Sequence, residues 1–268
     1  MLLFPNSKIN LGLNVLEKRP DGFHHIETVF YPIGLSDVLE IIIANDGKFE
    51  FNQTGLPIEG STEDNLVIKA YRLFVEDFKL APVKIHLHKV IPIGGGLGGG
   101  SSDGAFTIRL LNKLFSLGLS KSGMIEYSRK LGSDCAFFIK NKPVFAFGKG
   151  DQFEPLRVDL STYTMLLVVP AIQVNTSEAY SRIIPSKSER LLKNIVLQPV
   201  YQWRDQLQND FERSVFSQHP RIQQIRQRLY DLGAVYASMS GSGSAVYGLF
   251  EKKEIPLGLF SDCFVWQQ

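Results

Sequence analysis

The stretch Pro92-Ile93-Gly94-Gly95-Gly96-Leu97-Gly98-Gly99-Gly100-Ser101-Ser102 places six glycines within seven positions. Glycine lacks a Cβ and adopts positive φ freely, but it loses more chain entropy on ordering than any other residue. Packing does not explain such a run, because glycine adds no side chain to a core. The run instead allows successive backbone N–H groups to point at one ligand, and the ligand that they favour is an anion.

The residues around the glycines predict a strand before them and a helix after them. Apolar and polar residues alternate from residue 83 to 88, as in a half-buried strand. After Asp103, apolar residues recur at helical spacing up to Phe115. The order of strand, glycine loop and helix N-terminus predicts phosphate binding, because free N–H groups and the positive end of the helix dipole meet there. A flexible linker is the alternative, but a linker lacks such regular apolar flanks.

Two familiar phosphate loops do not fit the run. A P-loop requires a Lys directly after its last glycine, and here Ser101 follows Gly100. A dinucleotide fingerprint can be forced onto so many glycines, but the strand before it alternates in polarity. A central parallel strand covered by helices on both faces is almost continuously apolar.

Composition indicates a soluble enzyme of one large or two medium domains. The 268 residues are 44% apolar and 21% charged, and the net charge of +2 is too small to favour nucleic acid or a membrane surface as a partner. Cys135 and Cys263 have no metal-ligand spacing, and the N-terminus lacks the pattern of a signal peptide. No apolar run approaches the ~20 residues that span a bilayer. We therefore expect a cytoplasmic protein that acts on a small molecule.

The chain alternates helical and strand patterns, which predicts a mixed α+β fold. Lys8 and Asn10 share the polar face of a strand whose apolar face carries Ile9 and Leu11. Gly132 is expected to end a helix that begins near Ser120. The remaining predicted elements are strands over 38–43, 164–169, 234–239 and 245–250, and helices from about residue 65 and from Pro220, the latter stopped by Gly233.

Three segments together resemble the motifs of the GHMP kinases, which are small-molecule phosphotransferases. The segments are 5–11, the glycine loop 92–102 and the loop 240–244. The resemblance spans nearly the whole chain and implies a two-domain α+β fold with the active site in the interdomain cleft. It also implies an N-terminal ATP-binding domain over 1–155 and a C-terminal domain over 156–268. The break in periodicity near residues 148–160 is consistent with that boundary.

Four further segments resemble one branch of this family. They are 19–24, 63–66, 131–134 and 209–212. The resemblance implies transfer of the γ-phosphate of ATP to the tertiary 2-hydroxyl of a methylerythritol linked to cytidine diphosphate, a step of the non-mevalonate route to isoprenoid precursors. Other GHMP kinases, acting on homoserine, mevalonate or a sugar, are the first alternative. A nucleotide-binding protein without catalysis is the second.

The catalytic pair implied by the resemblance is Lys8 and Asp134. An alcohol is a poor nucleophile at neutral pH, so a carboxylate such as Asp134 would accept its proton. A cation such as Lys8 would stabilise the developing alkoxide and the phosphate charge. Without the resemblance, Asp134 is typical of a solvated loop residue. Lys8 alone could be a surface lysine on an edge strand, but Asn10 on the same face and Pro5 before it favour a site.

The resemblance also assigns ligand contacts. The triphosphate is expected on the glycine loop, with Ser101 or Ser102 near the phosphates and a Mg²⁺ ion whose protein ligands remain unknown. Adenine is expected at Asn65 and Leu66, although Asn65 is equally a helix cap. The nucleotide contacts are therefore Asn65, Leu66, Pro92, Ile93, Gly94, Gly95, Gly96, Leu97, Gly98, Gly99, Gly100, Ser101 and Ser102.

The acceptor site is assigned from the same resemblance. Phe23 offers a ring on which cytosine can stack, and His24 can hydrogen-bond the edge of the base. Relatives often carry Tyr at the position of Phe23, so stacking survives while one hydroxyl contact is lost. The adjacent His25 is the alternative to His24. The expected substrate contacts are Asn10, Phe23, His24, Asn175, Thr176 and Gly241, and the oligomeric state is left open.

Overall fold

The computed structural model describes residues 1–186, 191–252 and 254–268. Contacts divide the chain into two compact units. Unit 1 comprises 1–7, 34–93 and 98–142, and unit 2 comprises 8–33, 94–97 and 143–268. The glycine loop therefore belongs to both units, because its middle four residues pack with unit 2 and its ends with unit 1.

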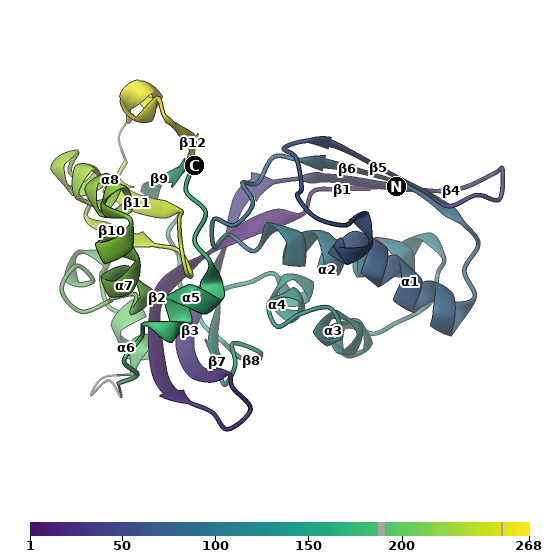
Figure 1. Ribbon diagram of the computed structural model, residues 1–268, viewed down its shortest axis with the longest axis horizontal. Coiled ribbons are helices and arrows are strands. Elements are labelled where there is room, and N and C mark those ends of the chain that lie inside the picture. Colours follow the sequence, from purple (N-terminus) through teal and green to yellow (C-terminus); the bar gives the residue numbers. More distant parts are fainter. Residues whose placement is uncertain (187–190, 253) are drawn as a thin grey trace. The chain divides into compact units, whose positions relative to one another are not determined.

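Unit 1 is built on a four-stranded sheet with the order β1-β4-β6-β5. Strand β4 pairs antiparallel with β6, and β6 pairs parallel with β5. Figure 1 shows the helices of this unit on one face of the sheet. The elements are β1 (Leu2–Leu3), β4 (Val38–Ile43), β5 (Glu50–Gly55), η1 (Thr62–Asp64), α1 (Leu66–Phe78), β6 (Val83–Lys89), α2 (Gly99–Leu114), α3 (Lys121–Arg129) and α4 (Cys135–Lys140).

Side-chain periodicity explains the strands and helices of unit 1. Along β6, Val83, Ile85 and Leu87 are buried and the residues between them are exposed or half-buried, so the predicted half-buried strand is confirmed. Helix α1 starts directly after Asn65, as predicted. The expectation for Gly132 is wrong. Helix α3 ends in a right-handed turn at Lys130, so no left-handed glycine is needed there.

Unit 2 contains two further four-stranded sheets, with the orders β10-β11-β9-β12 and β2-β3-β7-β8. Strands β2 and β3 begin or end in unit 1, but most of each lies in unit 2. The strands are β2 (Asn6–Lys18), β3 (His24–Ser36), β7 (Val144–Phe147), β8 (Gln152–Pro155), β9 (Tyr163–Pro170), β10 (Tyr236–Met239), β11 (Val246–Glu251) and β12 (Cys263–Gln267). The helices are α5 (Thr176–Ser181), α6 (Leu192–Val196), η2 (Val200–Gln202), α7 (Phe211–Gln218), α8 (Pro220–Asp231) and η3 (Leu257–Phe260).

The core of unit 2 lies where α7 and α8 pack together beside β10 and β11, as Figure 1 shows. Ile222, Ile225 and Leu229 form the buried face of α8. Pro220 is at the start of this helix and Gly233, with a φ of 92°, follows its end, so both predicted boundaries are confirmed. Strand β2 also contributes to this core through Leu13 and Val15. The core thus fixes the strand that carries Lys8 and Asn10.

Candidate active site

The glycine loop is open where a ligand would approach it. Gly94, Gly96 and Gly98 each have a φ of 72°, a conformation that other residues adopt at a cost. A Cβ at Gly94 or Gly100 would meet no atom within 4 Å. Close packing therefore does not explain these two glycines, and the backbone is accessible there.

Helix α2 begins at the end of this loop with Gly98 in the N-cap position. A glycine has no side chain to accept hydrogen bonds from the first turn, and none of the described residues supplies a side-chain cap. The Oγ of Ser102 is buried and has no hydrogen-bond partner among the described residues. Uncapped N–H groups, a free hydroxyl and the helix dipole make this end of α2 suited to a phosphate.

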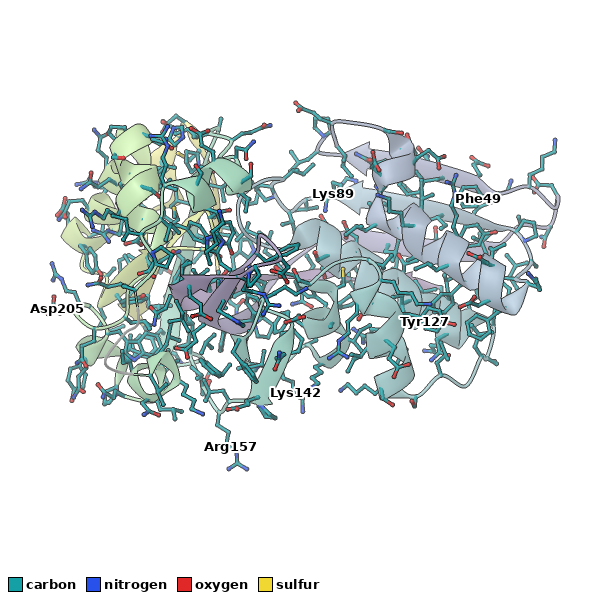
Figure 2. All side chains as sticks on the ribbon, turned by 60° about the horizontal axis from the view of Figure 1, so that its bottom comes forward. Phe49, Lys89, Tyr127, Lys142, Arg157 and Asp205 are labelled. Carbon is teal, nitrogen blue, oxygen red and sulfur yellow. The ribbon has the colours of Figure 1, made fainter. Side chains whose placement is uncertain are left out.

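A buried ionic cluster holds the first turn of α2 within unit 1. Lys89, labelled in Figure 2, donates to Asp103 over 2.8 Å and also to Asp37. Asp37 in turn accepts from the backbone N–H groups of Val90 and Ile91, at 2.6 and 2.9 Å. The side chains of Lys89, Asp37 and Asp103 are at most 3% exposed. The cluster thereby ties the end of β6 to the start of α2, on either side of the loop.

Burial and charge set the protonation of this cluster. Burial raises the pKa of Asp103 to about 8, since the Asp37 carboxylate adds to the effect and the Lys89 ammonium only partly offsets it. Burial lowers the pKa of Lys89, but the two carboxylates outweigh burial and the net shift is upward. Asp103 therefore retains a proton at neutral pH, while Lys89 stays charged.

The predicted adenine contacts lie beside the phosphate end of α2. Asn65 caps helix α1 by accepting a hydrogen bond from the N–H of Val67 at 2.9 Å, so its cap role is real. A Cβ at Gly104 would come within 3.0 Å of the Cβ of Leu66, so the two helices nearly touch there. Leu66, the first residue of α1, thus lies against the second turn of α2, and Asn65 directly precedes it.

Asp134 occupies the N-cap position of α4, a short helix that the sequence reasoning missed. It is half-buried, and Ser133 donates its hydroxyl to the Asp134 carboxylate over 3.3 Å. The next residue, Cys135, is buried, and helix α4 packs against α2. Burial raises the pKa of the Cys135 thiol to about 12, so the thiol stays protonated. Asp134 is therefore anchored next to the predicted phosphate-binding helix.

In unit 2, Lys8 and Asn10 form one buried polar cluster. The two side chains are 4% and 1% exposed, so Lys8 is not a surface lysine. The Lys8 ammonium donates to Asn10 Oδ1 at 2.6 Å and to the carbonyl oxygen of Gly96 at 3.1 Å. It also lies 4.9 Å from the centre of the Phe30 ring. Burying an amino group is costly unless it finds hydrogen-bond partners, and these two oxygens and the ring supply such contacts.

The loop 240–244 packs directly against the central residues of the glycine loop. The N–H of Ala245 donates to the carbonyl of Gly95, and the Ser240 hydroxyl donates to the carbonyl of Gly96 at 2.9 Å. A Cβ on Gly96 would overlap the carbonyl oxygen of Ser240. A Cβ on Gly241 would lie 3.3 Å from the carbonyl oxygen of Gly96 and 3.4 Å from Asn10 Oδ1, which is tight but not an overlap. The glycines here permit a close approach of two loops.

The predicted cytosine residues lie on the turn between β2 and β3. Phe23 is 59% exposed, and the Lys149 ammonium lies 4.9 Å from its ring centre. His24 stacks on Tyr180, with ring centres 4.8 Å apart. Burial, aided by Lys18, lowers the pKa of His24, so a neutral ring is favoured. A neutral imidazole presents one donor and one acceptor, which suits the edge of a polar base.

Helix α5 contacts both the loop 240–244 and His24, which follows the turn between β2 and β3. Its first residue, Thr176, hydrogen-bonds Ser242 at 3.0 Å, and Tyr180 stacks on His24. Residues four apart on a helix are separated by about 6 Å along its axis. Asn175 is occupied as the cap of this helix and accepts from the N–H groups of residues 177 and 178. The structure thus groups Thr176 with Gly241 and His24 with Tyr180, whereas Asn175 has a structural role.

Sequence reasoning missed Tyr180 because no local pattern marks it. It is one of nine tyrosines, and its partner His24 is far away in the chain. The one available signal was weak: Tyr180 comes four residues after Thr176, and this spacing places the two residues on one side of a helix.

A cavity of about 1010 Å³ lies elsewhere in unit 2. Asn209, Glu212, Arg226 and Ser238 line part of it, whereas Lys8, Phe23, His24 and Gly241 do not. None of the residues predicted for the active site lines this cavity.

Comparison with known proteins agrees with these features. The family described as GHMP kinases N terminal domain matches residues 65–142, and GHMP kinases C terminal matches residues 190–256. The 4-diphosphocytidyl-2-C-methyl-D-erythritol kinase of Bacteroides fragilis is 54% identical over 95% of this chain and 93% of its own. That of Parabacteroides distasonis is 50% identical over 100% of this chain and 98% of its own. The chain belongs to the 4-diphosphocytidyl-2-C-methyl-D-erythritol kinase family of GHMP kinases.

Solved structures place this GHMP kinase in the same fold. A crystal structure of 4-(cytidine 5'-diphospho)-2C-methyl-D-erythritol kinase has a TM-score of 0.85 and 28% identity, covering 100% of this chain and 98% of that chain. A homoserine kinase of Cytophaga hutchinsonii has a TM-score of 0.72 at 15% identity, covering 98% and 93%, which shows the shared fold alone. The predicted α+β GHMP fold is confirmed, as is an ATP-dependent small-molecule kinase.

Two further observations concern the described part of this GHMP kinase. Among residues 1–186, 191–252 and 254–268, no three His, Cys, Asp or Glu side chains gather into a metal-binding group. None of its described helices is long and apolar enough to cross a membrane. The predicted boundary at residue 155 lies between the two family matches and stays a prediction.

Proposed function

We propose that this kinase transfers the γ-phosphate of ATP to the 2-hydroxyl of 4-diphosphocytidyl-2-C-methyl-D-erythritol. The observation that carries the proposal is the 46–54% identity, over nearly the whole chain, to relatives named for that substrate. The homoserine and mevalonate kinases among its structural neighbours are only 14–18% identical and share the fold. Those acceptors are therefore not favoured.

The triphosphate is proposed to bind where the glycine loop meets helix α2. The open backbone at Gly94 and Gly100 and the uncapped first turn support this assignment. The remaining proposed contacts of the loop run from Pro92 to Ser102. Adenine would lie at Asn65 and Leu66, and Leu66 lies against α2 at Gly104.

Magnesium is proposed to enter with the nucleotide. Mg²⁺ usually keeps several waters and is held by substrate phosphates with one or two protein oxygens. The described residues fit this mode, because they offer no cluster of three acidic or imidazole groups but do offer the unpaired hydroxyl of Ser102. Ser101 and Ser102 are the residues that would lie near it. When bound, the ion would neutralise charge on the β- and γ-phosphates.

Asp134 and Lys8 are proposed to carry the chemistry. The Asp134 carboxylate would accept the proton of the 2-hydroxyl as that oxygen attacks the γ-phosphorus, while the bond to the β-phosphate oxygen breaks and ADP leaves. The Lys8 ammonium would stabilise negative charge on the attacking oxygen and the transferred group. Its burial supports this role, because an ammonium in a water-poor site acts more strongly than one in solvent.

The cytidine end is proposed to bind at the turn between β2 and β3. Phe23 would stack on the base and His24 would hydrogen-bond its edge, with Tyr180 holding the His24 ring in place. Asn10, Thr176 and Gly241 would contact the methylerythritol and diphosphate portions. Asn175 would contribute through its backbone, since its side chain caps α5. The cytoplasmic location remains a prediction.

The reaction is tested by measuring ADP release with ATP, Mg²⁺ and each of four acceptors. The acceptors are 4-diphosphocytidyl-2-C-methyl-D-erythritol, homoserine, mevalonate and galactose. We expect release with the first alone. Release with another acceptor would overturn the substrate assignment, and ATP binding without release would favour a non-catalytic binding protein.

The cytosine assignment is tested in the same assay with Phe23→Ala. The variant should raise the KM for the cytidine substrate and leave the KM for ATP unchanged, because only base stacking is lost. Phe4→Ala is the matched control, since Phe4 is 57% exposed and Phe23 59% exposed. A change confined to the KM for ATP would refute the assignment.

A further inference from the structure

The segment 209–212 is buried although it carries three polar side chains. Asn209 is 3% exposed and Glu212 is 8% exposed. The segment and the preceding Gln208 join β2 through two backbone hydrogen bonds, Leu13 N–H to Gln208 O and Asp210 N–H to Leu13 O. Asp210 also accepts from the N–H of Val15 at 2.7 Å. The segment is therefore fixed to the strand that carries Lys8.

Both the nitrogen and the oxygen of the Asn209 side-chain amide form hydrogen bonds within unit 2. Its Nδ2 donates to the carbonyl oxygens of Met239 and Gly241, both at 2.8 Å. Its Oδ1 accepts from the N–H of Phe211 at 3.0 Å. Two donors and one acceptor in this arrangement require an amide, because a carboxylate would face two carbonyl oxygens with no proton to share.

The two carbonyls that Asn209 holds flank Ser240. The Ser240 hydroxyl accepts from the N–H of Asn10 at 3.2 Å, donates to the Gly96 carbonyl at 2.9 Å and lies 3.4 Å from Asn10 Oδ1. Asn10 Oδ1 and the Gly96 carbonyl are also the two oxygens to which the Lys8 ammonium donates. Ser240 Oγ and Lys8 Nζ therefore share both oxygens.

Glu212 reinforces the same loop from the other side. Its carboxylate accepts from the N–H of Met239 at 2.8 Å and from the Ser238 hydroxyl at 3.0 Å, and it pairs with Arg226. The N–H and the carbonyl of Met239 are thus both held by the segment 209–212. Little freedom remains at the entry to the loop 240–244.

We propose that Asn209 is a positioning residue for Lys8. It fixes the backbone on both sides of Ser240, and Ser240 in turn fixes the two oxygens that orient the Lys8 ammonium. The inference rests on the proposed function, because it assigns Asn209 to the role of Lys8 in phosphate transfer. A displacement of about 1 Å in a catalytic group can lower a rate about 10²-fold, so a loosened loop is enough to impair transfer.

The test is a double-mutant cycle of Asn209→Ala and Lys8→Met, measured as kcat, KM for ATP and KM for the acceptor. Asn209→Ala alone should lower kcat about 10²-fold and change either KM less than about threefold. If Asn209 acts through Lys8, the double variant is no slower than Lys8→Met. Rate losses that multiply would overturn the proposal, because Asn209 would then act by another route.

Asn112→Ala is the matched control. Asn112 clamps a loop of unit 1 in the same manner, by donating to the carbonyl of Leu119 at 3.1 Å and accepting from its N–H at 3.0 Å. Both alanine variants should lower the midpoint of thermal unfolding to a similar extent, but only Asn209→Ala should lower kcat. Equal losses of kcat would show a general effect of stability and would overturn the proposal.

Two further arms keep the result interpretable. If Asn209→Ala does not fold, Ser240→Ala replaces it, and its loss of kcat must likewise vanish in the Lys8→Met background. If the wild-type protein phosphorylates a different acceptor, the proposed substrate is wrong, and the cycle measured with that acceptor still decides the role of Asn209. A wild-type protein inactive with every acceptor would overturn both proposals.

Discussion

Asp134 is the residue on which the proposed chemistry depends most directly. It stands at the start of α4, half-buried, and α4 packs against α2. Its side chain keeps partial access to solvent, so an acceptor hydroxyl can reach it. A lone Asp after a helix carries no local sign of this packing, because the partner helix α2 belongs to an earlier segment of the chain.

Asp134→Asn should retain binding and lose turnover. The amide keeps the size of the side chain but cannot accept a proton, so kcat should fall by about 10²–10⁴-fold. Isothermal titration should give ATP affinities within about threefold of wild type, and a coupled ADP assay measures kcat. Asp159→Asn, at an exposed turn, is the control and should keep wild-type turnover. Wild-type turnover in Asp134→Asn would remove it as the base.

At the scale of the elements, the glycine loop requires glycine at two positions for two different physical reasons. Gly94 and Gly96 share a φ of 72°, but only Gly96 lies against another backbone, at Ser240. The loop was predictable from composition, since six clustered glycines add nothing to a packed core and favour an exposed backbone. Its contact with the loop 240–244 was not predictable, because the two segments are about 140 residues apart and share no periodic pattern.

Replacing each of these two glycines by alanine separates the two reasons. Gly94→Ala should cost about 1 kcal/mol, the strain of a side chain at positive φ. Gly96→Ala should cost about 3 kcal/mol, because overlap with the Ser240 carbonyl adds to that strain. Urea unfolding followed by circular dichroism measures both. Equal losses would show that the close approach to Ser240 has no energetic consequence.

Across the whole molecule, periodic elements were predictable and tertiary contacts were not. Strands β4 and β6 and helix α1 follow regular apolar spacing, and Asn65 and Pro220 mark helix starts by their own chemistry. Helix α4 was missed because five of its six residues are buried, which leaves no amphipathic pattern. The cluster of Lys89, Asp37 and Asp103 was likewise hidden, since its members come from three separate segments.

This cluster should make the stability of the folded protein depend on pH. The pKa of Asp103 is raised from 3.8 to about 8, so the folded state holds a proton that the unfolded state has released. Its contribution to stability is complete below about pH 4 and is lost as the pH rises to about 8. The free energy of unfolding should therefore fall across this window, by up to about 1.4 kcal/mol per pH unit from this group.

Asp103→Asn is the variant that isolates this effect. An amide mimics the protonated carboxyl. In urea titrations at pH 5, 6, 7 and 8, the free energy of unfolding of the variant should therefore depend less steeply on pH than that of the wild-type protein. Asp46→Asn removes an exposed ion pair with Lys84 and should leave the slope of the wild-type protein intact. Parallel slopes for wild type and Asp103→Asn would show that Asp103 is already ionised in the folded protein.

The chain passes between its two units five times, after Ser7, Ile33, Ile93, Leu97 and Lys142. Neither unit is therefore a contiguous stretch of gene that could be expressed alone or exchanged with a relative as a cassette. Recombination at a single point would split at least one unit and leave part of its core in the other parent. Functional chimaeras of this kinase should therefore require several crossovers, placed at these junctions.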